Sequence, residues 1–128
     1  MRVISVPISP GELLDKITIL EIKMAQIQDE NKLKNIHTEL SLLNEVAEKL
    51  LSLKKISDLK QELKYVNQDL WKIEDDIRDH EKGKNFNDQF IELARSVYIK
   101  NDRRAELKKT INLELGSTLI EEKSYRQY

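Results

Sequence analysis

The sequence predicts an all-α protein, an antiparallel bundle of about four long helices that forms a single domain over residues 1–128. Apolar residues recur at spacings of three and four along most of the chain, which is the period of an amphipathic helix. Charged residues make up 35% of the chain, and only 3 Gly and 2 Pro are present, which disfavours turn-rich β structure. We expect helices at about 10–29, 32–52, 57–82 and 87–115, with short extended arms at both ends.

The first expected helix begins at a strong start signal. Ser9 can cap it, Pro10 suits its first position, and Glu12 completes a capping box. Its main apolar stripe has the spacing of one helix face and comprises Leu13, Ile17, Leu20, Met24 and Ile27. Ile19 and Ile22 lie on the opposite side, so this helix is either central in its bundle or shared with a second subunit. Such an exposed apolar face favours a homodimer.

The second and third helices have heptad-like seams, which predict a coiled-coil-like hairpin. The seam of the second helix consists of Leu33, Ile36, Leu40, Leu43, Ala47 and Leu50. The seam of the third helix consists of Ile56, Leu59, Leu63, Val66, Leu70, Ile73 and Ile77. A turn at residues 82–85 leads to the fourth helix, which Asn87 or Asp88 caps and Gly116 ends.

The two ends of the chain differ from the helices in composition. Residues 2–8 are rich in Val and Ile, and Pro7 excludes a central strand, so an extended arm is expected. Residues 117–128 mix apolar, charged and tyrosine side chains. They predict either a short helix or an extended arm that pairs with residues 2–8.

Composition excludes several classes of function. Lys and Arg number 22 against 23 Asp and Glu, so the net charge of −1 gives no general attraction to nucleic acid. The absence of Cys excludes disulfides and thiol catalysis. No apolar run approaches the roughly 18 residues of a membrane span, and no signal peptide is evident. We therefore expect a cytoplasmic protein. No phosphate-binding loop or activated nucleophile is present, so no catalytic residue is assigned and an enzyme is not favoured.

The main functional hint lies in the fourth helix. Between Val97 and Ile111 its apolar stripe is interrupted by polar side chains, namely Asn101, Arg104, Lys108 and, one step further on, Asn112. Arg95 and Tyr98 lie on the neighbouring edge. Cationic groups where a core is expected need either buried partners or a ligand.

Candidate partners for these cations lie on two other helices. Glu21 falls inside the apolar region of the first helix. A polar and aromatic row with the spacing of one helix face runs along the third helix and comprises Asn67, Trp71, Glu74 and Arg78. We expect Arg104 and Lys108 either to face Glu21 or Glu74 across the bundle, or to line an open pocket near Trp71.

These residues support two interpretations of function. The first is a non-enzymatic module that binds a partner protein or a small anionic ligand, because Arg, Lys and Asn together suit a carboxylate or phosphate. The alternative is a magnesium-dependent nucleotide pyrophosphatase-like hydrolase, with Glu12 and Asp15 as an ExxD metal pair. Acidic side chains in a first helical turn also interact favourably with the helix dipole, and this role needs no metal. No other cofactor is predicted.

Four stretches of the chain resemble an uncharacterised family of short helical proteins from marine bacteria and their phages. They are residues 8–23, 93–98, 101–105 and 121–125. The resemblance covers nearly the full length, although residues 32–64 contain no recognised motif. It implies an all-α protein and carries no assigned activity.

Overall fold

The computed structural model describes residues 3–128 and confirms the all-α prediction. Its helices are α1 (Pro10–Gln26), α2 (Glu30–Leu51), α3 (Lys54–Lys82) and α4 (Asp88–Glu114). Each observed boundary lies within three residues of the predicted one. Over residues 3–128 there is no strand, and both arms are extended, as predicted. Arg2, the first residue of the predicted N-terminal arm, lies outside the described residues.

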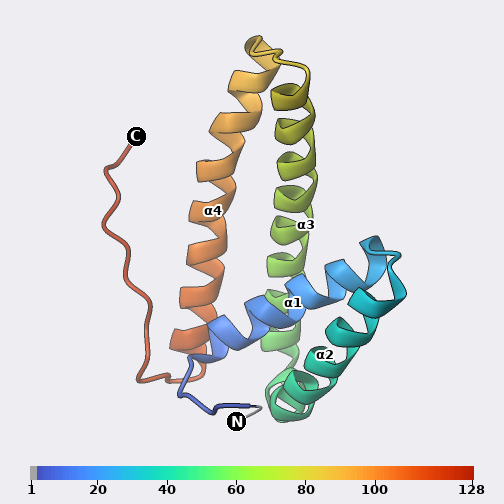
Figure 1. Ribbon diagram of the computed structural model, residues 1–128. Coiled ribbons are helices and arrows are strands. Elements are labelled where there is room, and N and C mark those ends of the chain that lie inside the picture. Colours follow the sequence, from blue (N-terminus) through green and yellow to red (C-terminus); the bar gives the residue numbers. More distant parts are fainter. Residues whose placement is uncertain (1–2) are drawn as a thin grey trace.

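The four helices pack as two hairpins that cross. Figure 1 shows α3 and α4 side by side as a long antiparallel pair, with α1 lying across its lower part. Helix α2 folds back beside α1, so that α1 touches all three other helices. The bundle is therefore centred on α1, and the upper part of the α3–α4 hairpin extends beyond it.

The hydrophobic core lies where α1 crosses the other helices. Leu14 and Ile17 are fully buried there, within a cluster completed by Leu13, Ala47, Ile56, Leu63, Val66, Leu107 and Ile111. Ile22, on the second apolar side of α1, is only 3% exposed, and Ile19 is partly buried. The expectation that Ile22 forms an exposed dimerisation face is therefore wrong, because α1 is central in its own bundle. The homodimer itself stays a prediction.

The ends of α1 and α4 follow the predicted capping signals. The Ser9 hydroxyl accepts a hydrogen bond from the backbone N–H of Glu12, at 3.2 Å. The Asn87 side chain accepts one from the N–H of Phe90 at 3.1 Å and caps α4. Gly116 ends α4 with a φ of 63°, in the left-handed region that favours glycine. Ser9 and Gly116 therefore mark where the N-terminal and C-terminal arms join the bundle, and Asn87 marks the start of α4.

The far part of the α3–α4 hairpin lacks a third layer. We call residues 68–101 the outer hairpin, and none of its residues is buried. Its seam residues are only half-buried, and they include Leu70, Ile73, Ile77, Phe90, Leu93 and Val97. Within residues 3–128, no helix is both long and apolar enough to cross a membrane.

Candidate functional site

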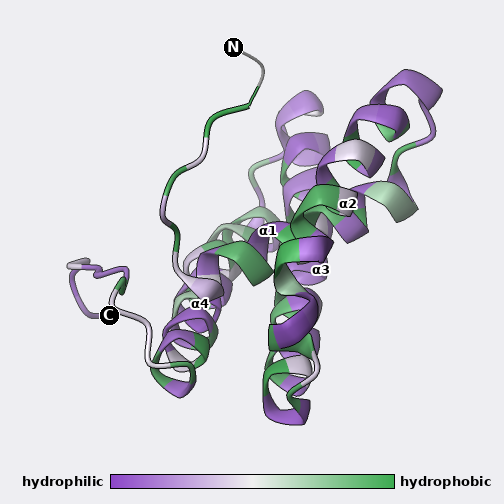
Figure 2. Cartoon of the chain, turned by 90° about the horizontal axis from the view of Figure 1, so that it is seen from below, coloured by the Kyte–Doolittle hydropathy of each residue, from purple (hydrophilic) through white to green (hydrophobic). Residues whose placement is uncertain are grey.

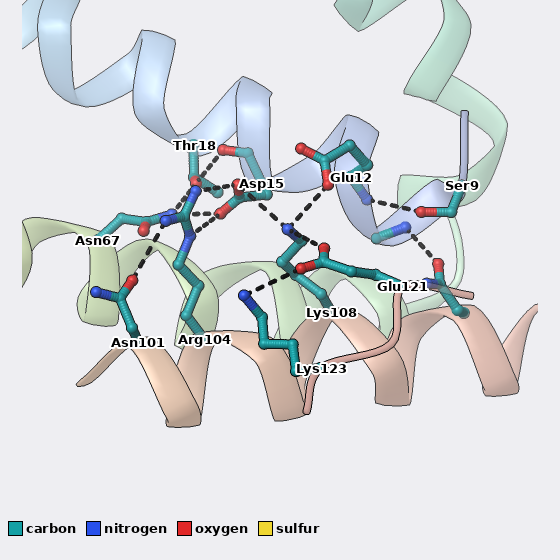
Figure 3. Close-up of polar contacts among 12 residues, drawn as sticks. Ser9, Glu12, Asp15, Thr18, Asn67, Asn101, Arg104, Lys108, Glu121 and Lys123 are labelled. Carbon is teal, nitrogen blue, oxygen red and sulfur yellow. Dashed lines mark hydrogen bonds and ion pairs between the residues drawn. The ribbon is translucent and has the colours of Figure 1, made fainter. Parts of the chain in front are cut away.

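A buried carboxylate at the start of α1 is the centre of the polar residues. Asp15 is 1% exposed, although it is charged. The Arg104 guanidinium of α4 donates to both of its oxygens, from Nε to Oδ1 at 2.9 Å and from Nη2 to Oδ2 at 2.5 Å (Figure 3). The hydrogen bond to Asp15 raises the pKa of Arg104 despite partial burial. This two-point pairing fixes both the distance and the orientation of α1 relative to α4.

Asn67 of α3 and Thr18 of α1 add further hydrogen bonds around Asp15. The Asn67 amide donates to Asp15 Oδ1 at 2.9 Å and to Thr18 Oγ1 at 2.8 Å. The Thr18 hydroxyl donates in turn to the backbone carbonyl of Asp15, at 2.7 Å. Both Asn67 and Thr18 are buried. Asp15 therefore accepts side-chain hydrogen bonds from two helices, which compensates for the loss of water around its charge.

A second cation connects α4 to the C-terminal arm. Lys108 is buried, and its Nζ lies 2.9 Å from a carboxylate oxygen of Glu12 and 2.9 Å from one of Glu121. Burial lowers the pKa of Lys108, but the hydrogen bonds to Glu12 and Glu121 outweigh it, so the pKa is raised overall. Lys123 contacts the other oxygen of Glu121 at 3.2 Å. Through Glu121, the arm is tied to the crossing of α1 and α4 (Figure 3).

The first turn of α1 lies directly against α4. The backbone N–H of Gly11 donates to Asn112 Oδ1 at 2.7 Å, and Asn112 is 1% exposed. A Cβ added to Gly11 would lie 2.9 Å from that oxygen and closer still to the backbone carbonyl of Lys108. Glycine is therefore needed for close approach. Together these residues form what we call the polar cluster, comprising Gly11, Glu12, Asp15, Thr18, Asn67, Arg104, Lys108, Asn112 and Glu121.

The attachment of the C-terminal arm is expected to weaken in acid. Hydrogen bonds from Lys108 and then Lys123 hold the pKa of Glu121 below its usual value near 4.5. A lowered pKa in the folded state adds stability that is present above the unfolded value and disappears as pH falls through the folded value. Spin relaxation of the amides of residues 119–127 should therefore show increased motion, relative to α4, as the pH is lowered below the usual pKa of a glutamate. In Glu121→Gln the arm should show this motion already at neutral pH, and unchanged relaxation would contradict this attachment.

The predicted partners of the two cations were wrong, although Arg104 and Lys108 do point into the molecule. Glu21 lies two turns further along α1 and faces α3, with Lys60 Nζ at 3.0 Å. Its second oxygen is buried 3.4 Å from Lys64 Nζ and makes no hydrogen bond. Because α1 crosses α4 at its first two turns, Asp15 and Glu12 reach these cations and Glu21 does not.

The predicted outer residues do not join the polar cluster. Glu74 is exposed and binds Arg78 on its own helix at 2.8 Å, rather than a cation of α4. Arg95 pairs with Glu92 in the same way, also at 2.8 Å. Trp71 is half-buried. The predicted set thus divides into an inner part inside the cluster and an outer part on the outer hairpin.

Asn101 and Tyr98 lie on α4 between the polar cluster and the upper part of the outer hairpin. The Asn101 carbonyl lies at the edge of the cluster, 3.5 Å from Arg104 Nη1. The Tyr98 ring makes an edge-to-face contact with Tyr128, with centroids 4.9 Å apart. Both residues line a groove of about 1080 Å³ between α4 and the C-terminal arm. The groove is the clearest concavity beside the predicted residues.

The carboxylates proposed for a metal serve a different purpose. Asp15 is held by Arg104, and Glu12 by Lys108, so each faces a cation rather than the other. Within the part of the chain that is described, no three His, Asp or Glu side chains are grouped as ligands for a metal ion. The magnesium alternative therefore gains no support from the arrangement of these residues.

Three participants in the polar cluster, Gly11, Thr18 and Glu121, were not anticipated. Glu121 lies in the arm, thirteen residues after Lys108, and no helical spacing relates the two. Thr18 was also missed, although its place one turn after Asp15 on a buried face was a usable signal. Asp15 was considered as a metal ligand or as a complement to the helix dipole, but a carboxylate among apolar residues also predicts an internal cation.

Comparison with known proteins places the chain in a family without adding an activity. A search of the curated proteins and a search of the solved structures each gave no match. A comparison with family models gave a match over residues 4–128, to a family described as being of unknown function. All the stretches on which the predicted resemblance depends lie within that range. The chain therefore belongs to this family of unknown function, DUF6165.

Proposed function

We propose that the protein is a non-enzymatic helical module that binds a partner protein through the outer hairpin. The observation that carries this proposal is the absence of any buried residue between 68 and 101, although both helices have an apolar seam there. Two helices alone leave such a seam half-exposed, whereas a third helix laid along them completes a bundle. The partner that fits is therefore an amphipathic helix of another protein.

One flank of the outer hairpin is open, and it lies on the same side as α1. Asn67 contacts α1, and the spacing of four, three and four residues places Trp71, Glu74 and Arg78 along the same face of α3. On α4, Val97 lies seven residues before Arg104, which reaches α1, and therefore lies along the same face. Helix α1 covers only the lower end of this flank (Figure 1). The remaining length is available to a partner.

On the opposite flank, ion pairs between the two helices lie at and below the lower end of the outer hairpin. Lys100 contacts Asp69 at 2.8 Å, and Arg103 contacts Glu62 at 3.4 Å. At 100° per residue, Asp69 and Glu62 lie on the side of α3 opposite to Asn67. Among the described residues, no ion pair links α3 and α4 on the α1 side. The two flanks thus differ in charge pairing at the lower end of the outer hairpin, and this difference favours the α1 side for docking.

The residue types on the open flank suit a protein interface. Trp and Arg are among the residue types that dominate the energetics of protein interfaces, and this flank contains Trp71 and Arg78. Trp71 is the only Trp of the chain. Trp71 and Arg78 belong to the outer part of the set that the sequence predicted as a site.

The same geometry favours a protein over a small anion. Arg104 and Lys108, which suited an anionic ligand, are matched by carboxylates inside the protein. An anion would have to displace Asp15 or Glu121 from these cations. A cytoplasmic location and an origin in marine bacteria or phages stay predictions that accompany the proposal.

The test places a photo-crosslinking amino acid at Arg78 in cells that produce the protein, with Tyr65 as the matched control. Tyr65 is 59% exposed and lies on the opposite side of α3. We expect a discrete adduct from position 78 and none from position 65. The adduct protein is then purified and titrated against the chain, with Trp71 fluorescence as the signal.

Substitution of the central residue completes this test. Trp71→Ala should weaken binding of that purified protein by about 30-fold or more in calorimetry, the effect of a typical interface hot spot. Tyr65→Ala should leave the affinity unchanged. Equal adducts at both positions, or an unchanged affinity in Trp71→Ala, would contradict docking on this flank.

A further inference from the structure

We propose that two copies of the chain exchange their N-terminal arms. Each arm, residues 3–8, would lie in the groove between α4 and the C-terminal arm of the other copy. The groove reaches the outer hairpin only at its lower end, where Val97, Tyr98 and Asn101 line it, and the proposal does not depend on the partner protein inferred above.

The first support is the exposure of the N-terminal arm. Val3, Ile4 and Val6 are 74%, 69% and 64% exposed, and Ile8 is 45% exposed. Figure 2 shows this arm as a largely hydrophobic, extended segment that points away from the helices. A run of β-branched apolar residues without cover is uncommon on a monomer and marks a contact surface. Such residues also favour an extended conformation.

The second support is the groove, which has the size and lining for a short extended segment. Its volume of about 1080 Å³ is just above the usual range for ligand pockets. Val97 and Ala105 of α4 and the rings of Tyr98, Tyr125 and Tyr128 supply the apolar part of its lining, and the other nine lining residues are polar or charged. The groove therefore offers apolar contacts to some side chains of an extended segment and polar groups to its backbone.

The third support is the state of the backbone in both arms. Within residues 3–128, no hydrogen bond between backbone groups involves residues 3–8 or residues 118–128. Leu119 bonds through its backbone to the Ser117 hydroxyl. Two extended segments whose other backbone groups do not bond to one another can pair as strands, which is a common mode of peptide recognition. Pro7 lacks an N–H, so the arm can pair along only part of its length, as an edge strand does.

A second copy fits better than the arm of the same chain. The Ser9 cap and the Gly11–Asn112 hydrogen bond hold the start of α1 against α4. From that point the N-terminal arm runs below α1, whereas the C-terminal arm runs up beside α4 (Figure 1). Pairing within one chain would require the start of α1 to be released. In a two-fold dimer each copy supplies one arm and one groove, so the contact forms twice.

Sedimentation of the full-length protein tests the exchange. We expect a dimer at micromolar concentration, and Ile4→Asp/Val6→Asp should raise its dissociation constant by more than about 100-fold. Both side chains are exposed in one copy, so the melting temperature at a concentration where the wild type is monomeric should not change. The matched control is Leu42→Asp/Val46→Asp on α2, where the residues are 51% and 68% exposed. It should remain dimeric.

A cross-linking experiment then locates the contact. Benzoylphenylalanine replaces Ile4, and the variant is mixed with ¹⁵N-labelled wild-type chain before irradiation. Adducts should join an unlabelled arm to a labelled peptide from residues 97–109 or 121–128. A protein that is monomeric at all concentrations, a dimer unaffected by the two arm substitutions, or adducts confined to one chain would each overturn the proposal. So would adducts that map to residues 68–96.

Discussion

Replacement of Asp15 by alanine is expected to lower the free energy of unfolding by about 2–4 kcal/mol. The substitution removes the carboxylate that accepts from Arg104 and Asn67, and it leaves both of these donors near or inside the core. Removing one partner of a buried ion pair costs about 3–5 kcal/mol. The Arg104 side chain is 29% exposed and can recover some water, which explains the lower value.

Urea denaturation at pH 7 measures this effect, with Glu74→Ala as the control. The Glu74–Arg78 pair is exposed and lies within one helix, so its loss should change stability by no more than about 0.5 kcal/mol. Asp15→Leu/Arg104→Met removes both charges and should restore part of the loss, because buried ion pairs are often replaceable by apolar residues. If Asp15→Ala were as mild as Glu74→Ala, the polar cluster would not hold α1 in place.

Gly11→Ala is expected to destabilise the protein by about 2–3 kcal/mol, through steric overlap alone. The new Cβ would overlap the backbone carbonyl of Lys108 and would lie 2.9 Å from Asn112 Oδ1. A backbone carbonyl cannot rotate away as a side chain can, so α1 would have to move from α4. That movement would also disturb the hydrogen bond from Gly11 to Asn112.

Gly83→Ala provides the matched control for this substitution. Its Cβ would meet no atom closer than 3.6 Å, and its φ of −83° is accessible to alanine. The change should therefore be neutral or slightly stabilising, by up to about 1 kcal/mol. Comparing the two variants by urea denaturation separates the close approach at Gly11 from the general effect of replacing glycine. Equal stabilities would show that α1 does not approach α4 as closely as described.

The helices were predictable because their signals are local. Ser9, Asn87 and Gly116 each act on backbone groups within a few residues. As predicted, the first two cap the starts of α1 and α4, and Gly116 follows the end of α4. The presence of polar side chains inside the bundle was also predictable, since Arg104 and Lys108 interrupt an apolar stripe on their own helix. What these residues contact could not be obtained in this way. Helical spacing relates residues of one helix and contains no information about a second helix that crosses it.

The sequence by itself determined that the protein is helical, where each helix lies, and that a polar cluster interrupts its core. Only the tertiary structure decided that Asp15 and Glu121, rather than Glu21 or Glu74, neutralise Arg104 and Lys108. The physical reason is the position of the crossing, which the packing of the apolar core around Leu14 and Ile17 sets. That crossing brings the first two turns of α1 to α4, and it leaves the outer hairpin without a third helix.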